Sequence, residues 1–174
     1  MNPQEYELWY EYFSGVLRFN PRWDLYDRTA MELFRKKTKP LSVVEFGFSR
    51  PKIDPATDRY FTQQLSWIAD HDFARCLSIT TDDRAPELAK DHYKKLKVFV
   101  PNEGSVVNYF KAKIHEIEIG QADLLLLSEG MPGAWDWSVL KPGALVIAEG
   151  PYELNGHTGL KKVFSGPIPL WRKP

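Results

Sequence analysis

The same two residues, glutamate and then glycine, end two apolar segments of this 174-residue chain. Ser128, Glu129 and a glycine follow the run 123–127, and Glu149 and a glycine follow the run 144–148. Such runs are typical of buried strands, and the ends of neighbouring strands lie about 5 Å apart. Two carboxylates so placed can share a divalent cation, or one can act as a general base. Polar residues also end strands that have no such role, so both interpretations stay open.

A glycine and two aspartates follow the first two apolar runs of the chain. The run 41–46 leads into Gly47, where the backbone can turn sharply and a ligand can approach it closely. One glycine does not make the G-x-G-x-x-G cradle of a dinucleotide site, so that kind of site is not expected. After the run 76–80, Asp82 and Asp83 lie where nucleotide-binding sheets carry a carboxylate for the ribose hydroxyls. One of them can cap the helix that follows, and both roles can hold, with one aspartate for each.

Metal-ligating and nucleophilic patterns are weak in this sequence. The four histidines, His71, His92, His115 and His157, have no ligand spacing such as H-x-x-x-H, so we expect no zinc site. There is no G-x-S-x-G nucleophile elbow, and Cys76 lies inside an apolar run, where a thiol is usually inert. The sequence gives no support to covalent catalysis.

Helical patterns and apolar runs alternate along the chain and must position these residues. We expect two aromatic-rich helices, 6–17 and 26–37, then a helix capped by Thr57, another from Pro86 to about Leu96, and one over 107–117. Strands are expected at 41–47, 76–80, 97–100, 123–127 and 144–148, with a closing hairpin between 156 and 171.

Strands that are continuous apolar runs, separated by helices, predict a mostly parallel sheet covered on both faces. We therefore expect an α/β, doubly wound, Rossmann-like fold with three layers and two N-terminal helices. The chain reads as one domain, 1–174, with N-terminal helices over 1–40, a core over 41–150 and a closing hairpin over 151–174. Ligands of such sheets bind at the carboxyl ends of the strands, near the point where the strand order reverses.

Composition narrows the function classes. The 23 basic residues balance the 23 acidic ones, which argues against binding nucleic acid mainly through a basic surface. No apolar run approaches the roughly 20 residues of a membrane helix, and the first residues lack the pattern of a signal peptide. A single cysteine fits a reducing compartment. We expect a cytoplasmic protein that makes no contact with a membrane.

The order of these segments resembles the class I S-adenosylmethionine-dependent methyltransferases. The resemblance is carried by Val-Val-Glu-Phe-Gly at 43–47, the two aspartates after the second strand, Ala-Asp-Leu-Leu-Leu-Leu at 122–127, and Leu-Lys-Pro-Gly at 140–143 before the fifth strand. The last of these is the most specific. The resemblance covers about residues 41–150. The first motif of the family corresponds to the segment after the first strand, which has a single glycine here, Gly47.

The resemblance implies that residues after the strands bind S-adenosylmethionine. They are Glu45, Gly47, Phe48 and Ser49 in the first motif beside the methionine part, Asp82 or Asp83 at the ribose, Asn102 and Glu103 near the adenine, and Ser128 and Glu129 facing the transferred methyl group. Glu129 or Glu149 would be the general base. Some relatives hold a divalent metal with acids after the fourth and fifth strands, where these two glutamates stand.

Two functions follow as hypotheses. The first is methyl transfer from S-adenosylmethionine to an oxygen or nitrogen nucleophile of a small molecule or RNA. The second is a methyltransferase-like domain without catalysis that acts as a binding or assembly module, or forms a homodimer or larger complex. Aromatic rows at helical spacing, as in the first two helices, are usually core. If they are exposed, five tryptophans would supply the anchors for such a partner: Trp9, Trp23, Trp135, Trp137 and Trp171.

Overall fold

The computed structural model describes residues 3–36, 40–101, 121–128, 137–149, 154 and 159–174. In chain order these residues form α1 (Pro3–Leu17), α2 (Trp23–Phe34), β1 (Leu41–Phe46), α3 (Phe61–Asp70), β2 (Ala74–Ile79), α4 (Ala85–His92), β3 (Lys97–Phe99), β4 (Leu124–Leu127), a short 3-10 helix (Trp137–Val139), β5 (Leu145–Ala148), β6 (Lys161–Phe164) and β7 (Leu170–Arg172).

The strands form one seven-stranded sheet in the order β3-β2-β1-β4-β5-β7-β6. The first five strands are parallel, whereas β7 runs antiparallel to β5 and to β6. The predicted α/β class, the mostly parallel sheet and the closing hairpin are therefore confirmed. The strand order reverses between β1 and β4, so this is the pair of strand ends where a ligand site is expected.

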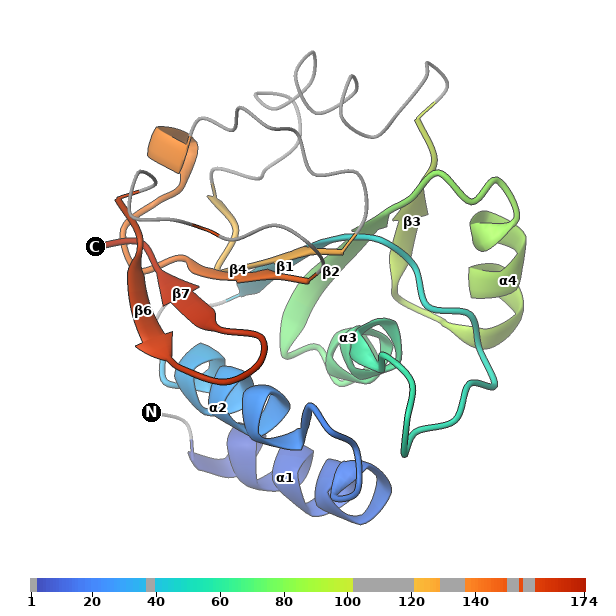
Figure 1. Ribbon diagram of the computed structural model, residues 1–174. Coiled ribbons are helices and arrows are strands. Elements are labelled where there is room, and N and C mark those ends of the chain that lie inside the picture. The colour runs from blue at the N-terminus through green and yellow to red at the C-terminus, as the bar shows by residue number, and fades with distance from the viewer. Residues whose placement is uncertain (1–2, 37–39, 102–120, 129–136, 150–153, 155–158) are drawn as a thin grey trace.

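Alternation along the strands divides the core between the two faces of the sheet. Leu41 and Val43 of β1 pack in the cluster that contains the buried side chains of α1, α2 and α3, whereas Val44 and Phe46 pack in the other cluster. Figure 1 shows these three helices on one side of the sheet. The helix expected over 107–117, which the three-layer interpretation needs, lies outside the described residues.

The largest aromatic side chains that α1 and α2 direct toward the sheet are core, whereas Tyr10 is 43% exposed. Trp9 and Phe13 are each 1% exposed, and the ring of Trp9 stacks on that of Trp23 at 5.7 Å. Trp9 does not meet the condition of exposure for a partner anchor, because its ring is covered by the chain itself. Trp23, Trp137 and Trp171 are half-buried, and Trp135 lies outside the described residues.

Two helix boundaries differ from the prediction. Thr57 does not cap α3: its hydroxyl donates to Asp54 in a turn, and the helix begins four residues later at Phe61. α4 has its proline in the first turn, as expected, but ends at His92 because the backbone of Tyr93 is extended. None of the helices in the described part of the chain is both long and apolar enough to cross a membrane.

A buried carboxylate fixes the amino-terminal edge of the sheet, opposite to the predicted ligand edge. Asp123, 2% exposed, accepts a hydrogen bond from the backbone N–H of Ser42 at 2.9 Å and pairs with Lys141 at 2.9 Å. Lys36, which follows α2, lies 4.0 Å from the same carboxylate and donates to the carbonyl oxygen of Gly143. Burial lowers the pKa of Lys36. These contacts tie β1, β4 and the turn before β5 to the end of α2.

Candidate functional site

A hollow of about 450 Å³ lies at the carboxyl ends of the parallel strands, at the point where the strand order reverses. That volume is within the usual range of small-molecule sites. It is lined by residues that follow β1, β4 and β5 and by residues from three other segments: Gly47, Phe48, Ser128, Glu149, Arg22, Arg59 and Ile168. The hollow therefore brings together four of the residues that the sequence singled out.

Gly47 is the floor of this hollow and has no room for a side chain. Its φ is +126°, a backbone conformation that L residues rarely adopt. A Cβ there would lie 2.6 Å from Oγ of Ser128 and 3.0 Å from Nη1 of Arg59. Ser128 is fixed in turn, because its hydroxyl donates to the carbonyl oxygen of Phe46 at 2.9 Å. The glycine permits close contact between the ends of β1 and β4 and the side chain of Arg59.

Glu149 lies between two arginines. Its Oε1 accepts a hydrogen bond from Nε of Arg22 at 2.9 Å, and its Oε2 lies 4.0 Å from Nε of Arg59. The Glu149 side chain is 11% exposed, so water screens these charges only in part. Arg22 stands directly before α2, and Arg59 lies in the loop between β1 and α3. Among the described lining residues, two positive charges and one negative charge give a net charge of +1, which favours an anionic ligand group.

Arg59 presents the end of its guanidinium group to the hollow. Its Nε donates to Oγ of Ser49 at 3.3 Å, while no hydrogen bond between described residues uses its Nη1 or Nη2. Both of these nitrogens lie close above Gly47. A guanidinium held by its inner nitrogen, with the outer two directed into a hollow, can bind a carboxylate through two parallel hydrogen bonds.

Glu45 does not line the hollow. Its side chain is 1% exposed, and its Oε1 accepts a hydrogen bond from the hydroxyl of Thr62 in α3 at 2.9 Å. The same hydroxyl accepts from the backbone N–H of Ser49 at 2.8 Å. The structure therefore places Glu45 beneath α3, where it connects β1 to the helix and to the loop that carries Ser49, the hydrogen-bond partner of Arg59.

Asp82 is engaged by two arginines outside the hollow. Its Oδ1 accepts from the backbone N–H of Arg84 at 3.1 Å, and its Oδ2 lies 3.5 Å from Arg50 in the loop after β1. The first contact stabilises the turn before α4, but Arg84 occupies the N-cap of that helix and no side chain caps it, so the predicted capping role is wrong. Asp83 is exposed at that turn. The remaining predicted site residues, Asn102, Glu103 and Glu129, lie outside the described residues.

Cys76 and His71 are reactive side chains that the structure describes outside the hollow, and both pack against apolar or aromatic neighbours. Burial raises the pKa of the Cys76 thiol, and the side chain packs in the core. The ring of His71 stacks on Trp67 at 3.9 Å. Among the described residues, no group of three His, Cys, Asp or Glu side chains is placed to hold a metal ion.

Arg22, Arg59 and Ile168 are the lining residues that sequence reasoning missed. Arg22 stands before α2, Arg59 lies late in the loop after β1, and Ile168 precedes β7, and no motif marks any of them. A usable signal exists for Arg59, because it lies in the loop that follows the glycine of the first predicted strand. For Arg22 and Ile168 there is none, since only the folding of α2 and of the last hairpin onto the sheet brings them to the hollow.

Neither a protein-family model nor a curated protein matches this sequence. What the chain can bind has therefore to be inferred from its fold and from the residues of the hollow.

Proposed function

We propose that this protein is an S-adenosylmethionine-dependent methyltransferase of the class I kind, which methylates an oxygen or nitrogen nucleophile. The observation that carries the proposal is the hollow at the reversal of strand order, with Gly47 as its floor. The 3-2-1-4-5 order is that of doubly wound nucleotide-binding sheets, and the antiparallel hairpin β6–β7 is what the resemblance implies for the closing segment.

The residues of the hollow fit the amino-acid end of the donor. Nη1 and Nη2 of Arg59 lie above Gly47, where the resemblance implies the methionine part, and they can take its carboxylate as a bidentate pair. This chain then uses a side chain where a glycine-rich first motif uses backbone N–H groups. No described residue is assigned to the adenine.

The chemistry asks little of the protein beyond alignment. A bound sulfonium supplies an activated methyl group, which bonds to the acceptor as the carbon–sulfur bond breaks with its electron pair left on sulfur. The hollow holds the two partners in line. Glu149 is the described carboxylate that can take the proton of the nucleophile, and Glu129 is its alternative.

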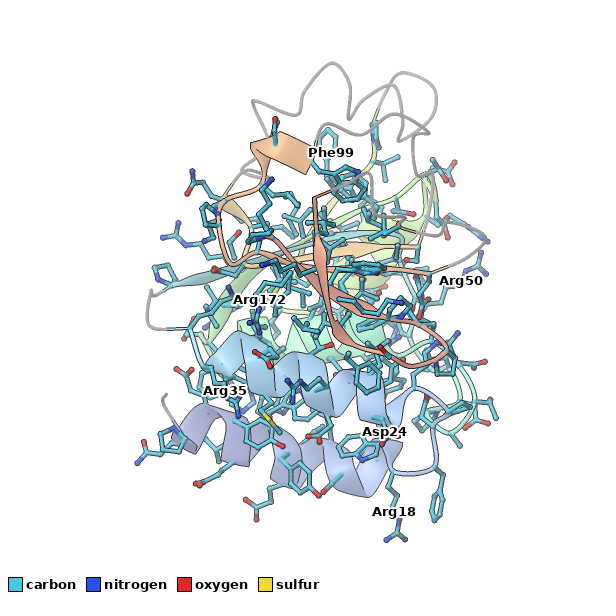
Figure 2. The ribbon with its side chains drawn as sticks, turned by 60° about the vertical axis from the view of Figure 1, so that its left-hand side comes forward. Arg18, Asp24, Arg35, Arg50, Phe99 and Arg172 are labelled. Carbon is cyan, nitrogen blue, oxygen red and sulfur yellow. The ribbon has the colours of Figure 1, made fainter. Side chains whose placement is uncertain are left out.

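Calorimetry with two ligands tests this proposal. S-adenosylhomocysteine carries the carboxylate, whereas 5′-methylthioadenosine lacks the whole amino-acid end. We expect the protein to bind S-adenosylhomocysteine, and Arg59→Met to weaken that binding about tenfold or more while leaving 5′-methylthioadenosine unaffected. Arg18→Met is the matched control, because Arg18 lies over the ring of Phe19 just after α1, on the side of that helix away from the sheet (Figure 2), and does not line the hollow.

The absence of any heat with S-adenosylhomocysteine would overturn the proposal. One observation then favours the binding-module alternative. Glu149 already has an arginine at each carboxylate oxygen, so the hollow can be stable without a ligand. In that case the candidates for a partner surface are exposed, largely apolar side chains in α1 and just after it, in place of the tryptophans. They are Leu8, Tyr12 and Phe19.

A further inference from the structure

A second hollow of about 300 Å³ lies between the start of α2 and the turn that joins β6 to β7. Figure 1 shows this turn beside α2, although the two are far apart in sequence. The α2 side contributes Pro21 and Leu25, and the turn contributes Phe164, Pro167 and Ile168. All five are apolar, so the walls of the hollow favour an apolar group.

The two hollows are continuous in their lining. Arg22 and Ile168 border both of them. Arg22 also donates to Glu149 at 2.9 Å, so the arginine and the carboxylate stand at the boundary between the two spaces. A molecule in the second hollow can therefore direct a polar atom toward Glu149 and toward the space above Gly47.

Phe164 gives the second hollow an aromatic wall. A Cβ on Gly166 would lie 2.6 Å from Cε1 of Phe164, so the ring lies directly against the glycine backbone of the turn. A ring that is held in this way offers a fixed surface for a flat partner, and aromatic pairs gain energy beyond the area that they bury.

The charges around the second hollow do not fit a nucleic acid. Of the described residues that line it, one is basic, Arg22, which is paired with Glu149, and one is acidic, Asp24. Figure 2 shows Asp24 near the turn between β6 and β7. Binding of a phosphate backbone needs several unpaired basic side chains. The lining instead suits a small molecule with an apolar ring and a single polar group.

We propose that the second hollow binds the methyl acceptor, and that the acceptor is a small aromatic alcohol or amine. Its ring lies against Phe164, and its hydroxyl or amino group is directed past Arg22 toward Glu149. This inference rests on the proposed methyltransferase function and selects the small-molecule acceptor over RNA.

The test measures the binding of 2-naphthol by ligand-observed NMR in the presence of saturating S-adenosylhomocysteine. We expect binding by the wild-type protein that Phe164→Ala weakens by about fivefold. Phe99→Ala, the same substitution on the strand at the other edge of the sheet, leaves it unchanged. Since Phe164 also packs on the core, a second variant, Ser165→Phe, narrows the hollow at an exposed position and is expected to weaken binding as well.

S-adenosylhomocysteine binding checks that each variant is folded and separates the two proposals. If the wild-type protein binds S-adenosylhomocysteine but not 2-naphthol, or if both variants bind 2-naphthol as wild type does, the acceptor site is overturned and the methyltransferase proposal survives. Salt-dependent binding of a single-stranded RNA that Phe164→Ala weakens would overturn the small-molecule assignment. If 2-naphthol binding depends on Phe164 while S-adenosylhomocysteine does not bind, the donor proposal alone is overturned.

Discussion

Gly47→Ala is the substitution that most directly tests the geometry of the hollow. An alanine at φ +126° carries backbone strain of about 1–3 kcal/mol. Its Cβ would also lie 2.6 Å from Oγ of Ser128, so the serine must give up its hydrogen bond to Phe46, at about 0.5–1.5 kcal/mol. We therefore expect a loss of about 2–4 kcal/mol, which lowers the melting temperature by about 5–15 °C for a chain of this size.

Thermal and urea unfolding of four variants separate the backbone strain from the lost hydrogen bond. The variants are Gly47→Ala, Ser128→Ala, the two combined, and Gly159→Ala. In a Ser128→Ala background the Cβ no longer meets a hydroxyl, so the cost of Gly47→Ala should shrink by about 0.5–1.5 kcal/mol. Gly159→Ala controls for backbone strain, because Gly159 has φ +67° and nothing within 4 Å of an added Cβ, and it should cost about 1 kcal/mol. The close contact would be refuted if the Gly47→Ala protein had the melting temperature of the wild type. It would also be refuted if the loss of unfolding free energy were the same with Ser128 and with Ala at that position.

Three further substitutions test an ion pair, a buried tyrosine and an exposed helix glycine of the fold. Asp123→Asn should cost about 2 kcal/mol in urea unfolding, less than for a fully buried ion pair because Lys141 is 29% exposed; a loss below about 0.5 kcal/mol would contradict the pairing. Burial raises the pKa of Tyr26 from 10.0 to about 12, so the folded state holds this proton more tightly and wild-type stability falls as the pH rises from 10 to 12. Between pH 8 and 11 the unfolding free energy of the wild type should therefore fall by about 1 kcal/mol more than that of Tyr26→Phe. Parallel pH profiles of the two proteins would contradict the burial of Tyr26. Gly15→Ala, in α1 with nothing within 4 Å, should raise stability by about 0.5–1 kcal/mol, whereas a loss would indicate a neighbour.

The sheet was predictable because burial on both faces makes each central strand a continuous apolar run. Leu124–Leu127 is buried at every position, and so is Leu145–Ala148. Thr57 shows where such reasoning stops. It has the residue type of a helix cap, but it lies inside a turn in which the backbone oxygen of Asp54 accepts from the N–H groups of Thr57 and Asp58, and the helix begins only at Phe61. A helical pattern does not show that a separate turn comes before the helix.

The site was only half predictable for a related reason. Gly47, Ser128 and Glu149 could be found because they follow strands, and parallel strands bring their carboxyl ends to one edge. Which way a side chain turns at that edge depends on its neighbours. Glu45 is one residue from the end of β1, yet the pleat directs it beneath α3 to Thr62. Arg22 comes to the edge only because α2 packs against the same face.

Arg59 gives a physical reason why a single glycine can be enough in this first motif. A glycine-rich loop binds an anion through several backbone N–H groups, each with a partial charge. One guanidinium supplies two N–H donors side by side and a full charge, and Arg59 holds both above Gly47. The glycine is still required, but for a different purpose: it leaves the space that the guanidinium occupies.

Arg59→Lys should therefore restore little of the affinity for S-adenosylhomocysteine that Arg59→Met removes, because an ammonium group is a point charge without the paired donors. Full recovery with lysine would show that charge alone is needed there, and that the paired geometry above Gly47 has no part in binding.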